Sequence, residues 1–253
     1  MINRFTRYLK MRKIDMLDEI TTKVINQYLD WLDVAAKTKR NHLGEIRRML
    51  QHAVIEEVLF SNPGAHAKCP KGPKANLHRD LDAIDLKLIF EHADQWHLYY
   101  RFLYHTGLRA GDVAMLRLKN IDRKHQTIVS LVRKSRKVHE FPLPQILNQA
   151  IDWGIDDDSP LFPTLYSLSE QTLNGKLKKP RKHMQAILKS HERPHATLHS
   201  FRRAFNNALR DLGLDIQDRK ALLAHASVDT TLMYTSRNLE LARHFVDQIT
   251  VTH

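Results

Sequence analysis

The chain has 253 residues, enough for one large domain or two modest ones, and its 42% hydrophobic content excludes a disordered protein. A formal net charge of +12 at pH 7 favours a polyanionic partner, a nucleic acid first and an anionic membrane surface second. No apolar run is long enough to span a membrane, and the N-terminus lacks the apolar core of a signal peptide. The single cysteine, Cys69, excludes an internal disulfide and fits a reducing cytoplasm.

A break in the sequence pattern divides the chain near residue 75. The stretch 69–76 combines Pro, Gly and Lys without apolar periodicity, and it follows the helix-ending Ser-Asn-Pro-Gly at 61–64. We therefore predict two domains, residues 1–74 and residues 75–253. Glycine and proline are sparse, so the expected fold class is mainly α with a small antiparallel β-sheet.

The first domain is predicted to be helical. Thr21 or Thr22 is the expected cap of one helix, and a second helix is expected to follow Thr38, with Leu43, Ile46 and Leu50 on its apolar face. Basic side chains gather at the start of this second helix and two turns further on, where they could meet phosphates or form a solvated charged face. These candidate DNA contacts are Lys37, Lys39, Arg40, Arg47 and Arg48.

The second domain mixes helices with a β-hairpin. The patterns predict helices over residues 81–93, 96–105, 200–212, 215–224 and 238–250. Strands are expected at 127–132 and 138–142, since both are rich in β-branched residues and separated by a short turn. The last helix is amphipathic and could pack on its own domain or on a neighbouring protomer.

Six residues of the second domain carry the chemistry of a phosphate site. Arginines grip phosphates with a planar fork, and a tyrosine hydroxyl can attack phosphorus covalently. Each residue alone has an ordinary interpretation, such as a surface ion pair, a solvated turn lysine or a core aromatic. Together they indicate DNA strand cleavage through a protein–phosphate bond. The set is Arg109, Lys134, His199, Arg202, His225 and Tyr234.

The turn of the predicted hairpin holds four cations. Any of them could protonate a departing oxygen, and composition alone does not choose among them. They are Arg133, Lys134, Arg136 and Lys137.

Two patterns resemble metal sites but favour none. His191, His195 and His199 are spaced four apart, yet Pro194 interrupts the helix that would align them. The acidic run 156–158 follows Gly154 in an apparent loop, where a solvated turn is expected rather than a Mg²⁺ site.

Three motifs resemble those of the tyrosine recombinase (phage integrase) family. They are Thr-Gly-Leu-Arg-Ala-Gly-Asp at 106–112, His-Ser-Phe-Arg at 199–202, and Leu-Leu-Ala-His-Ala-Ser-Val-Asp-Thr-Thr-Leu-Met-Tyr-Thr at 222–235. Lys134 lies eight residues before Pro142, the family's spacing, which selects it over Arg133 and Lys137. Two positions depart from the family pattern: Arg203 stands where a histidine is common, and Ala224 where a glycine is common.

The resemblance implies a helical core-binding domain followed by a catalytic domain with a defined mechanism. Tyr234 would form a 3′-phosphotyrosine, while Arg109 and Arg202 clamp the non-bridging oxygens. His225 would add a donor, His199 would assist proton transfer, and Lys134 would act as general acid. No metal, cofactor or ATP is expected. Arg133, Arg136, Lys137 and Arg203 are further expected DNA contacts.

The same resemblance implies the partners: double-stranded DNA with an inverted-repeat core site, other protomers in a synaptic tetramer, and accessory DNA-bending proteins, with no membrane. We expect a cytoplasmic, nucleoid-associated protein whose terminal helix docks into a neighbouring protomer. Two alternatives stay open at this point. One is a type IB topoisomerase, which shares the chemistry but acts as a monomer, and the other is a DNA-binding regulator that has lost catalysis.

Overall fold

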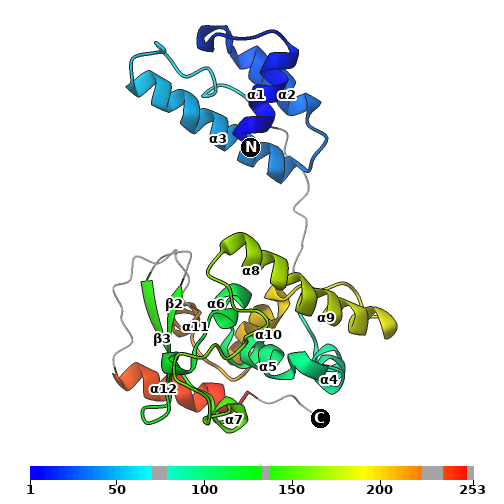
Figure 1. Ribbon diagram of the computed structural model, residues 1–253, viewed down its shortest axis with the longest axis vertical. Helices are drawn as coiled ribbons and strands as arrows, with labels where there is room; N and C mark the ends of the chain where they lie inside the picture. Colours follow the sequence, from blue (N-terminus) through cyan, green and yellow to red (C-terminus); the bar gives the residue numbers. More distant parts are fainter. Residues whose placement is uncertain (70–78, 133–136, 224–235, 250–253) are drawn as a thin grey trace. The chain divides into compact units, whose positions relative to one another are not determined.

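The computed structural model describes residues 1–69, 79–132, 137–223 and 236–249, and they form a mainly helical protein with one small sheet (Figure 1). The expected fold class is therefore confirmed. The chain divides into two compact units, Met1–Ala75 and Asn76–His253. Within the described ranges, no helix is both long and apolar enough to cross a membrane.

In its described residues, the first unit is built from three α-helices. They are α1 (Ile2–Met11), α2 (Thr22–Trp31) and α3 (Ala36–Ile55). Thr21 caps α2 as predicted, because its side chain accepts a hydrogen bond from the main-chain nitrogen of Val24. The predicted start of α3 after Thr38 was wrong. The helix begins earlier because the main-chain nitrogen of Thr38 already bonds to the carbonyl of Ala35, whose side chain makes no cap.

Aromatic rings fill the core of this unit. Phe5, Tyr8 and Tyr28 are buried, and the ring centroids of Phe5 and Tyr28 lie 4.9 Å apart. The Tyr28 hydroxyl lies 2.7 Å from Nδ1 of the buried His42, which brings α2 onto α3. The apolar face predicted for α3 is the face that is buried, as the near-zero exposure of Leu50 illustrates.

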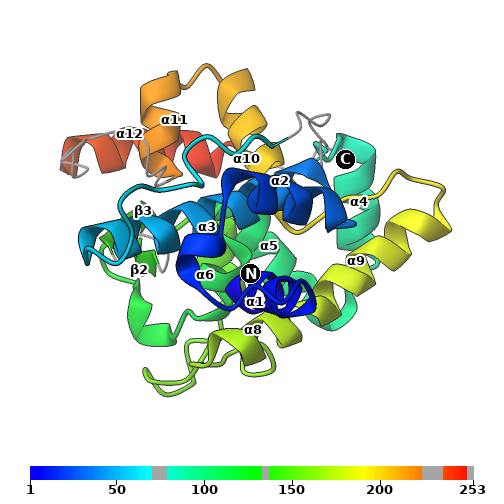
Figure 2. The same ribbon diagram turned by 90° about the horizontal axis from the view of Figure 1, so that it is seen from above.

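The second unit is built around two central helices. Its helices are α4 (Ala83–Glu91), α5 (His97–Thr106), α6 (Ala110–Ala114), α7 (Gln145–Ala150), α8 (Glu170–Lys176), α9 (Lys178–Ser190), α10 (His199–Asp211), α11 (Ile216–Leu222) and α12 (Ser236–Asp247). Helices α5 and α10 pack together at the centre, where Tyr100 stacks on Phe201 with ring centroids 5.5 Å apart (Figures 1 and 2). The apolar stripe predicted for α10 is confirmed, since Phe201, Phe205 and Leu209 are all buried.

The sheet has three antiparallel strands in the order β1-β2-β3. They are β1 (Ile121–Asp122), β2 (Thr127–Val132) and β3 (Lys137–Pro142). The predicted hairpin is confirmed, with Ile128 opposite Phe141 and Ser130 opposite His139. Because side chains alternate along a strand, Phe141 and His139 share one face of β3, and Phe141 is fully buried there. The turn was predicted at 133–137; residues 133–136 lie outside the described residues, and Lys137 belongs to β3.

The terminal helix α12 packs on its own unit. It lies against β3, and Ala242, Val246 and the following Ile249 are buried in the core (Figure 1). Arg243 Nη2 donates to the carbonyl of His125 at 2.7 Å. Asp247 accepts a 2.8 Å hydrogen bond from the main-chain nitrogen of Gln145. In the single chain, the apolar face of α12 is therefore buried against its own unit.

An ion-pair network fixes the segment that leads into α10. Asp85 of α4 is fully buried, and it accepts hydrogen bonds from Arg79 and Arg193. Arg79 also donates to the carbonyl of Pro194 at 2.7 Å. Burial opposes ionisation of Asp85, but the two arginines outweigh it and lower its pKa to about 2. The loop before His199 is thereby attached to the start of the unit.

The buried His105 of α5 should make the protein less stable in acid. Burial, together with the charge of Arg101, lowers the pKa of His105 to about 4. In the unfolded chain it would titrate near ~6.5, so its contribution is intact above that pH and is lost as the pH falls from ~6.5 towards ~4. We expect His105 alone to cost about 1.4 kcal/mol of unfolding free energy between pH ~7.5 and ~5.5.

Urea unfolding of the wild type and of His105→Leu at the two pH values measures this effect. The variant should show the smaller pH dependence. Equal pH dependence in the two proteins would contradict a neutral buried imidazole at this position.

Candidate active site

Arg109 is positioned by a left-handed turn. Helix α5 ends at Gly107, whose φ of 59° lies in the region that glycine tolerates best, and the chain then reverses into α6. Arg109 is the N-cap residue of α6, and its side chain is 29% exposed. Its Nη1 atom lies 3.9 Å from Oδ2 of Asp112, a nearly buried carboxylate one turn later. The turn thus presents a partly exposed guanidinium that faces the carboxylate of Asp112.

Arg202 is a buried cation at the junction of three helices. It lies in the first turn of α10 and is only 6% exposed. Its Nη1 donates to the carbonyl of Gly107 at 2.7 Å, and its Nη2 donates to the carbonyl of Leu223. These bonds join α10 to the end of α5 and to the end of α11. The guanidinium is therefore fixed by main-chain atoms rather than by a flexible surface partner.

The two arginines share one electrostatic environment. Burial and, to a smaller extent, the positive charge of Arg109 lower the pKa of Arg202 to about 10, whereas Asp112 acts in the opposite direction. Arg202 still carries its charge at neutral pH. Two guanidiniums that repel each other in a partly buried position would be stabilised by an anion bound between them. This is the arrangement that a phosphate-binding site requires.

His139 of β3 belongs to the same environment, and the sequence did not single it out. Its Nε2 atom lies 2.9 Å from the carbonyl of Leu222, the residue next to the Arg202 partner Leu223. Burial lowers the pKa of His139, and the charges of Arg202 and Arg109 lower it further. One signal was available: His139 is a polar residue on the strand face that also carries the buried Phe141.

The structure brings together part of the predicted catalytic set. Arg109 and Arg202 lie close enough for the charge of Arg109 to lower the pKa of Arg202. His199 is exposed at the start of α10, three residues before Arg202 and thus near the same side of the helix. Lys134, His225 and Tyr234 lie outside the described residues, so their roles stay predictions. The same holds for the hairpin cations Arg133 and Arg136, whereas Lys137 begins β3.

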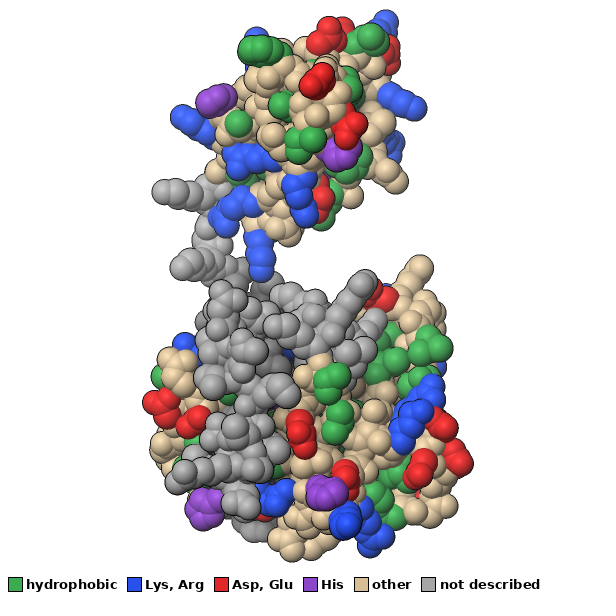
Figure 3. All heavy atoms as spheres, turned by 90° about the vertical axis from the view of Figure 1, so that its left-hand side faces the viewer, with side chains coloured by type: hydrophobic (Ala, Val, Ile, Leu, Met, Phe, Trp, Pro, Cys, Tyr) green, Lys and Arg blue, Asp and Glu red, His purple; other side chains and the backbone are tan. Residues whose placement is uncertain are grey.

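Of the predicted DNA contacts in the first unit, some are exposed and others are bonded within the chain. Lys37, Lys39 and Arg40 lie in the first turns of α3, on the surface or partly exposed. Figure 3 shows Lys and Arg side chains distributed over the surface of this unit. Arg47 instead donates to the carbonyls of Gly64 and Ala67, at 2.8 and 2.9 Å, and so anchors the segment after α3.

Two further predicted DNA contacts form ion pairs within the chain. Arg48 pairs with Glu45 on the surface of α3. Arg203, the residue that departs from the family pattern, pairs with Asp80 at the start of the second unit and lowers the pKa of that carboxylate. A DNA phosphate would have to compete with these partners.

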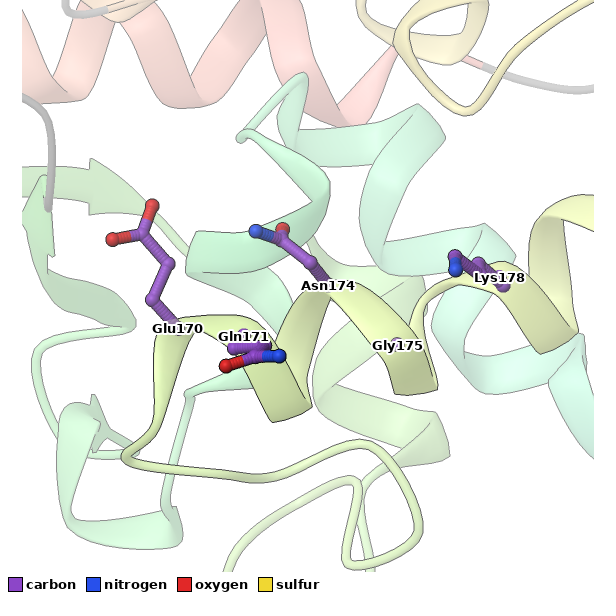
Figure 4. A pocket seen from close by; sticks show the side chains of 5 residues that line it. All are labelled: Glu170, Gln171, Asn174, Gly175 and Lys178. Carbon is purple, nitrogen blue, oxygen red and sulfur yellow. The ribbon is translucent and has the colours of Figure 1, made fainter. Parts of the chain in front are cut away.

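A basic surface on α8 and α9 was missed by the sequence reasoning. Four cations at the start of α9 are exposed: Lys178, Lys179, Arg181 and Lys182. Beside them an open hollow of about 740 Å³ is lined by polar residues of α8 and by Lys178 (Figure 4). Its amide-bearing members, Gln171 and Asn174, have side chains of the kind that bond base edges. The sequence signal is the run of cations from 176 to 182.

Residues of the two metal-like patterns have local partners. His191 stacks on His92, and His195 bonds to Gln185, so these imidazoles serve separate local contacts. Asp158 pairs with Lys119 and Arg117, which offsets part of the negative charge of the acidic turn. Among the described residues, no cluster of three or more metal-ligating side chains occurs.

Comparison with known proteins identifies the class. The pattern of the phage integrase family matches residues 79–240, and that of the phage integrase SAM-like domain matches residues 1–69. Tyrosine recombinase XerD of Vibrio vulnificus is 28% identical over 246 residues, covering 87% of this chain and 77% of the relative. Tyrosine recombinase XerC of Myxococcus xanthus is 28% identical over 264 residues, covering 96% and 86%.

The fold is likewise shared with solved structures. A lambda integrase dimer bound to a COC′ core site superimposes with a TM-score of 0.66 at 18% identity, covering 97% of this chain and 71% of that one. The chain therefore belongs to the phage integrase family of tyrosine recombinases, enzymes of site-specific DNA recombination. This assignment favours recombination over the topoisomerase alternative.

Gly107 should tolerate no side chain. A Cβ atom there would lie 2.3 Å from Phe205 Cδ1 and 2.9 Å from Leu223 Cδ2, in addition to the strain of its positive φ. We expect Gly107→Ala to lower the unfolding free energy by about 1–3 kcal/mol and to displace the carbonyl that holds Arg202. Thermal unfolding measures the first effect and DNA cleavage the second.

The matched control is Gly175→Ala in α8, where an added Cβ meets nothing within 4 Å. That variant should unfold like the wild type or slightly later. Equal stability of the two alanine variants would contradict the close packing described at the α5–α6 turn.

Proposed function

We propose that this recombinase cuts DNA by forming a 3′-phosphotyrosine at Tyr234. The observation that carries the proposal is the buried, main-chain-fixed Arg202, which shares its electrostatic environment with Arg109. Such a pair can hold the two non-bridging oxygens of a scissile phosphate and stabilise the charge that develops there, which is usually the largest catalytic term. It supplies positive charge that other nucleases take from metal ions.

The proposed step balances in atoms and charge. The Tyr234 oxygen bonds to phosphorus as the bond from phosphorus to the 5′ oxygen breaks. His199 assists removal of the tyrosine proton, and Lys134 gives a proton to the departing 5′ oxygen. His225 adds a further donor to the phosphate. Attack by the 5′ hydroxyl of a partner strand reverses the step and releases Tyr234, so the phosphotyrosine bond conserves the energy and no ATP is required.

The proposed substrate is duplex DNA with an inverted-repeat core site, held by several protomers. The similarity to a lambda integrase dimer on a core site and a lambda integrase tetramer on a Holliday junction supports a synaptic tetramer. In that assembly we propose that the terminal helix α12 leaves its cis position and docks into the neighbouring protomer. Within each protomer, the start of α3 and the exposed cations of α9 would contact the DNA backbone.

Removal of the Tyr234 hydroxyl should abolish the covalent adduct while leaving DNA binding intact. Tyr234→Phe keeps the ring but has no nucleophile. The test incubates the protein with a nicked core-site substrate in EDTA and looks for a protein–DNA band on a denaturing gel. Wild type should give that band in EDTA and the variant should not. An adduct formed by Tyr234→Phe would remove this residue from the role, and dependence of the wild type on Mg²⁺ would overturn the metal-free mechanism.

Lys134 should matter only when the leaving oxygen needs a proton. We expect Lys134→Ala to slow cleavage by about 10²–10⁴-fold with nearly unchanged DNA affinity. A substrate with sulfur in place of the bridging 5′ oxygen has a leaving group that needs no proton. That substrate should restore the rate of the variant. If it does not, Arg133 or Lys137 becomes the candidate acid.

The exposed cations of α9 should set affinity rather than chemistry. Replacing Lys178 and Lys182 by alanine should weaken DNA binding and lower the slope of log affinity against log salt by about two. Lys87→Ala is the control, because Lys87 is an exposed lysine of α4 that faces Glu91. An unchanged salt slope in the double variant would show that α9 does not meet the DNA backbone.

A further inference from the structure

His139 makes a hydrogen bond that defines its tautomer. The carbonyl oxygen of Leu222 can only accept, and it lies 2.9 Å from Nε2, so Nε2 carries the proton and donates. The contact spans two distant parts of the unit, since His139 belongs to β3 and Leu222 is the last residue of α11. β3 is thereby attached to the C-terminal end of a helix.

That helix end has two adjacent carbonyls held by two different donors. The last carbonyls of a helix have no partner within the helix and are ordinarily satisfied by water or a cap. Here the carbonyl of Leu222 receives His139, and the carbonyl of Leu223 receives Arg202. The position of the Leu223 carbonyl therefore depends on both contacts. In the sequence, His225 follows Leu223 by two residues.

The surroundings explain why the donor is an imidazole. Arg202 and Arg109 both lower the pKa of His139, in addition to burial, so the ring is neutral at pH 7. A lysine or arginine at this position would place a third permanent charge beside the two guanidiniums. A neutral ring donates a hydrogen bond without adding to that repulsion. Its ring also lies 6.4 Å from that of Phe141, which fixes it against the core.

We propose that His139 is a positioning residue for strand cleavage, which holds the end of α11 so that the Leu223 carbonyl keeps Arg202 aimed at the scissile phosphate. The inference rests on the proposed function of Arg202. His139 acts through the helix end and touches no reacting atom. It adds a residue of the β-sheet to a site otherwise built from helix ends and turns.

Two near-isosteric variants test the hydrogen bond. His139→Gln keeps a neutral N–H donor on a side chain of similar reach, whereas His139→Met has similar length and no donor. We expect the methionine variant to cleave a saturating suicide substrate about 10–100-fold more slowly, the range for a lost hydrogen bond that leaves a partly buried carbonyl without its donor. The glutamine variant should stay within about 3-fold of the wild type. DNA affinity should be unchanged in both, because no phosphate contact is removed.

Glu140→Ala is the control, since Glu140 is the exposed neighbour on the other face of β3. It should cleave at the wild-type rate. Thermal unfolding checks that all variants are folded at the assay temperature.

The outcomes separate this inference from the proposed function. If the wild type forms no adduct through Tyr234, the proposed function fails before His139 is tested. If the wild type cleaves and His139→Met cleaves equally well, His139 is not a positioning residue and the proposed function stands. Equal slow cleavage by the glutamine and methionine variants, or unfolding of the glutamine variant at the assay temperature, would also overturn the role of the donor.

Discussion

The burial of the Arg202 guanidinium is the constraint on which the rest of the site depends. A buried cation is costly unless its donors are satisfied, and here two main-chain carbonyls satisfy them. One carbonyl belongs to Gly107, at the turn that also presents Arg109, and the other to Leu223, at the end of α11. Three helices must therefore meet in one arrangement for Arg202 to be tolerated. The packing of the second unit and the geometry of the proposed phosphate site therefore both depend on this one arrangement of helices.

The groups around Arg202 offset only part of its positive charge, so a bound anion would stabilise the site further. Asp112 offsets part of the positive potential, and His139 donates a hydrogen bond while neutral. The repulsion between Arg109 and Arg202 remains, and a phosphate would relieve it. Holding two like charges near each other lowers the stability of the free protein, but it places both charges where they can stabilise the transition state. The fold thus holds the guanidiniums in place before DNA arrives.

Local patterns in the sequence predicted a large part of the fold. The apolar stripe of α10, the cap at Thr21 and the β2–β3 hairpin each depend on residues close in the chain, so periodicity and capping chemistry reveal them. The start of α3 was misplaced because its N-cap, Ala35, has no capping side chain. Arg109, His199 and Arg202 were predicted from motif spacing, and the charge of Arg109 acts on the buried Arg202; their catalytic roles stay predictions.

The remaining features depend on contacts that no local pattern encodes. His139 meets Leu222 across 83 positions of sequence. Arg47 was predicted as a DNA contact from its place on a basic helix of a basic chain, whereas its partners in the structure are the carbonyls of Gly64 and Ala67. The cations of α9 were not considered in the sequence analysis. Only the fold reveals that these exposed cations border an open hollow, whose lining includes the amides of Gln171 and Asn174 and the carboxylate of Glu170.

The central claim is that Arg109 and Arg202 neutralise the non-bridging oxygens of a scissile phosphate. A core-site substrate with a methylphosphonate at the cleavage position tests it most directly, because one of those oxygens is replaced by a neutral methyl group. Arg109→Ala should cleave the ordinary phosphate about 10²–10³-fold more slowly than the wild type, but it should cleave the methylphosphonate nearly as fast as the wild type does. An equal loss on both substrates would contradict the account, because it would mean that Arg109 acts through something other than the charge of the phosphate.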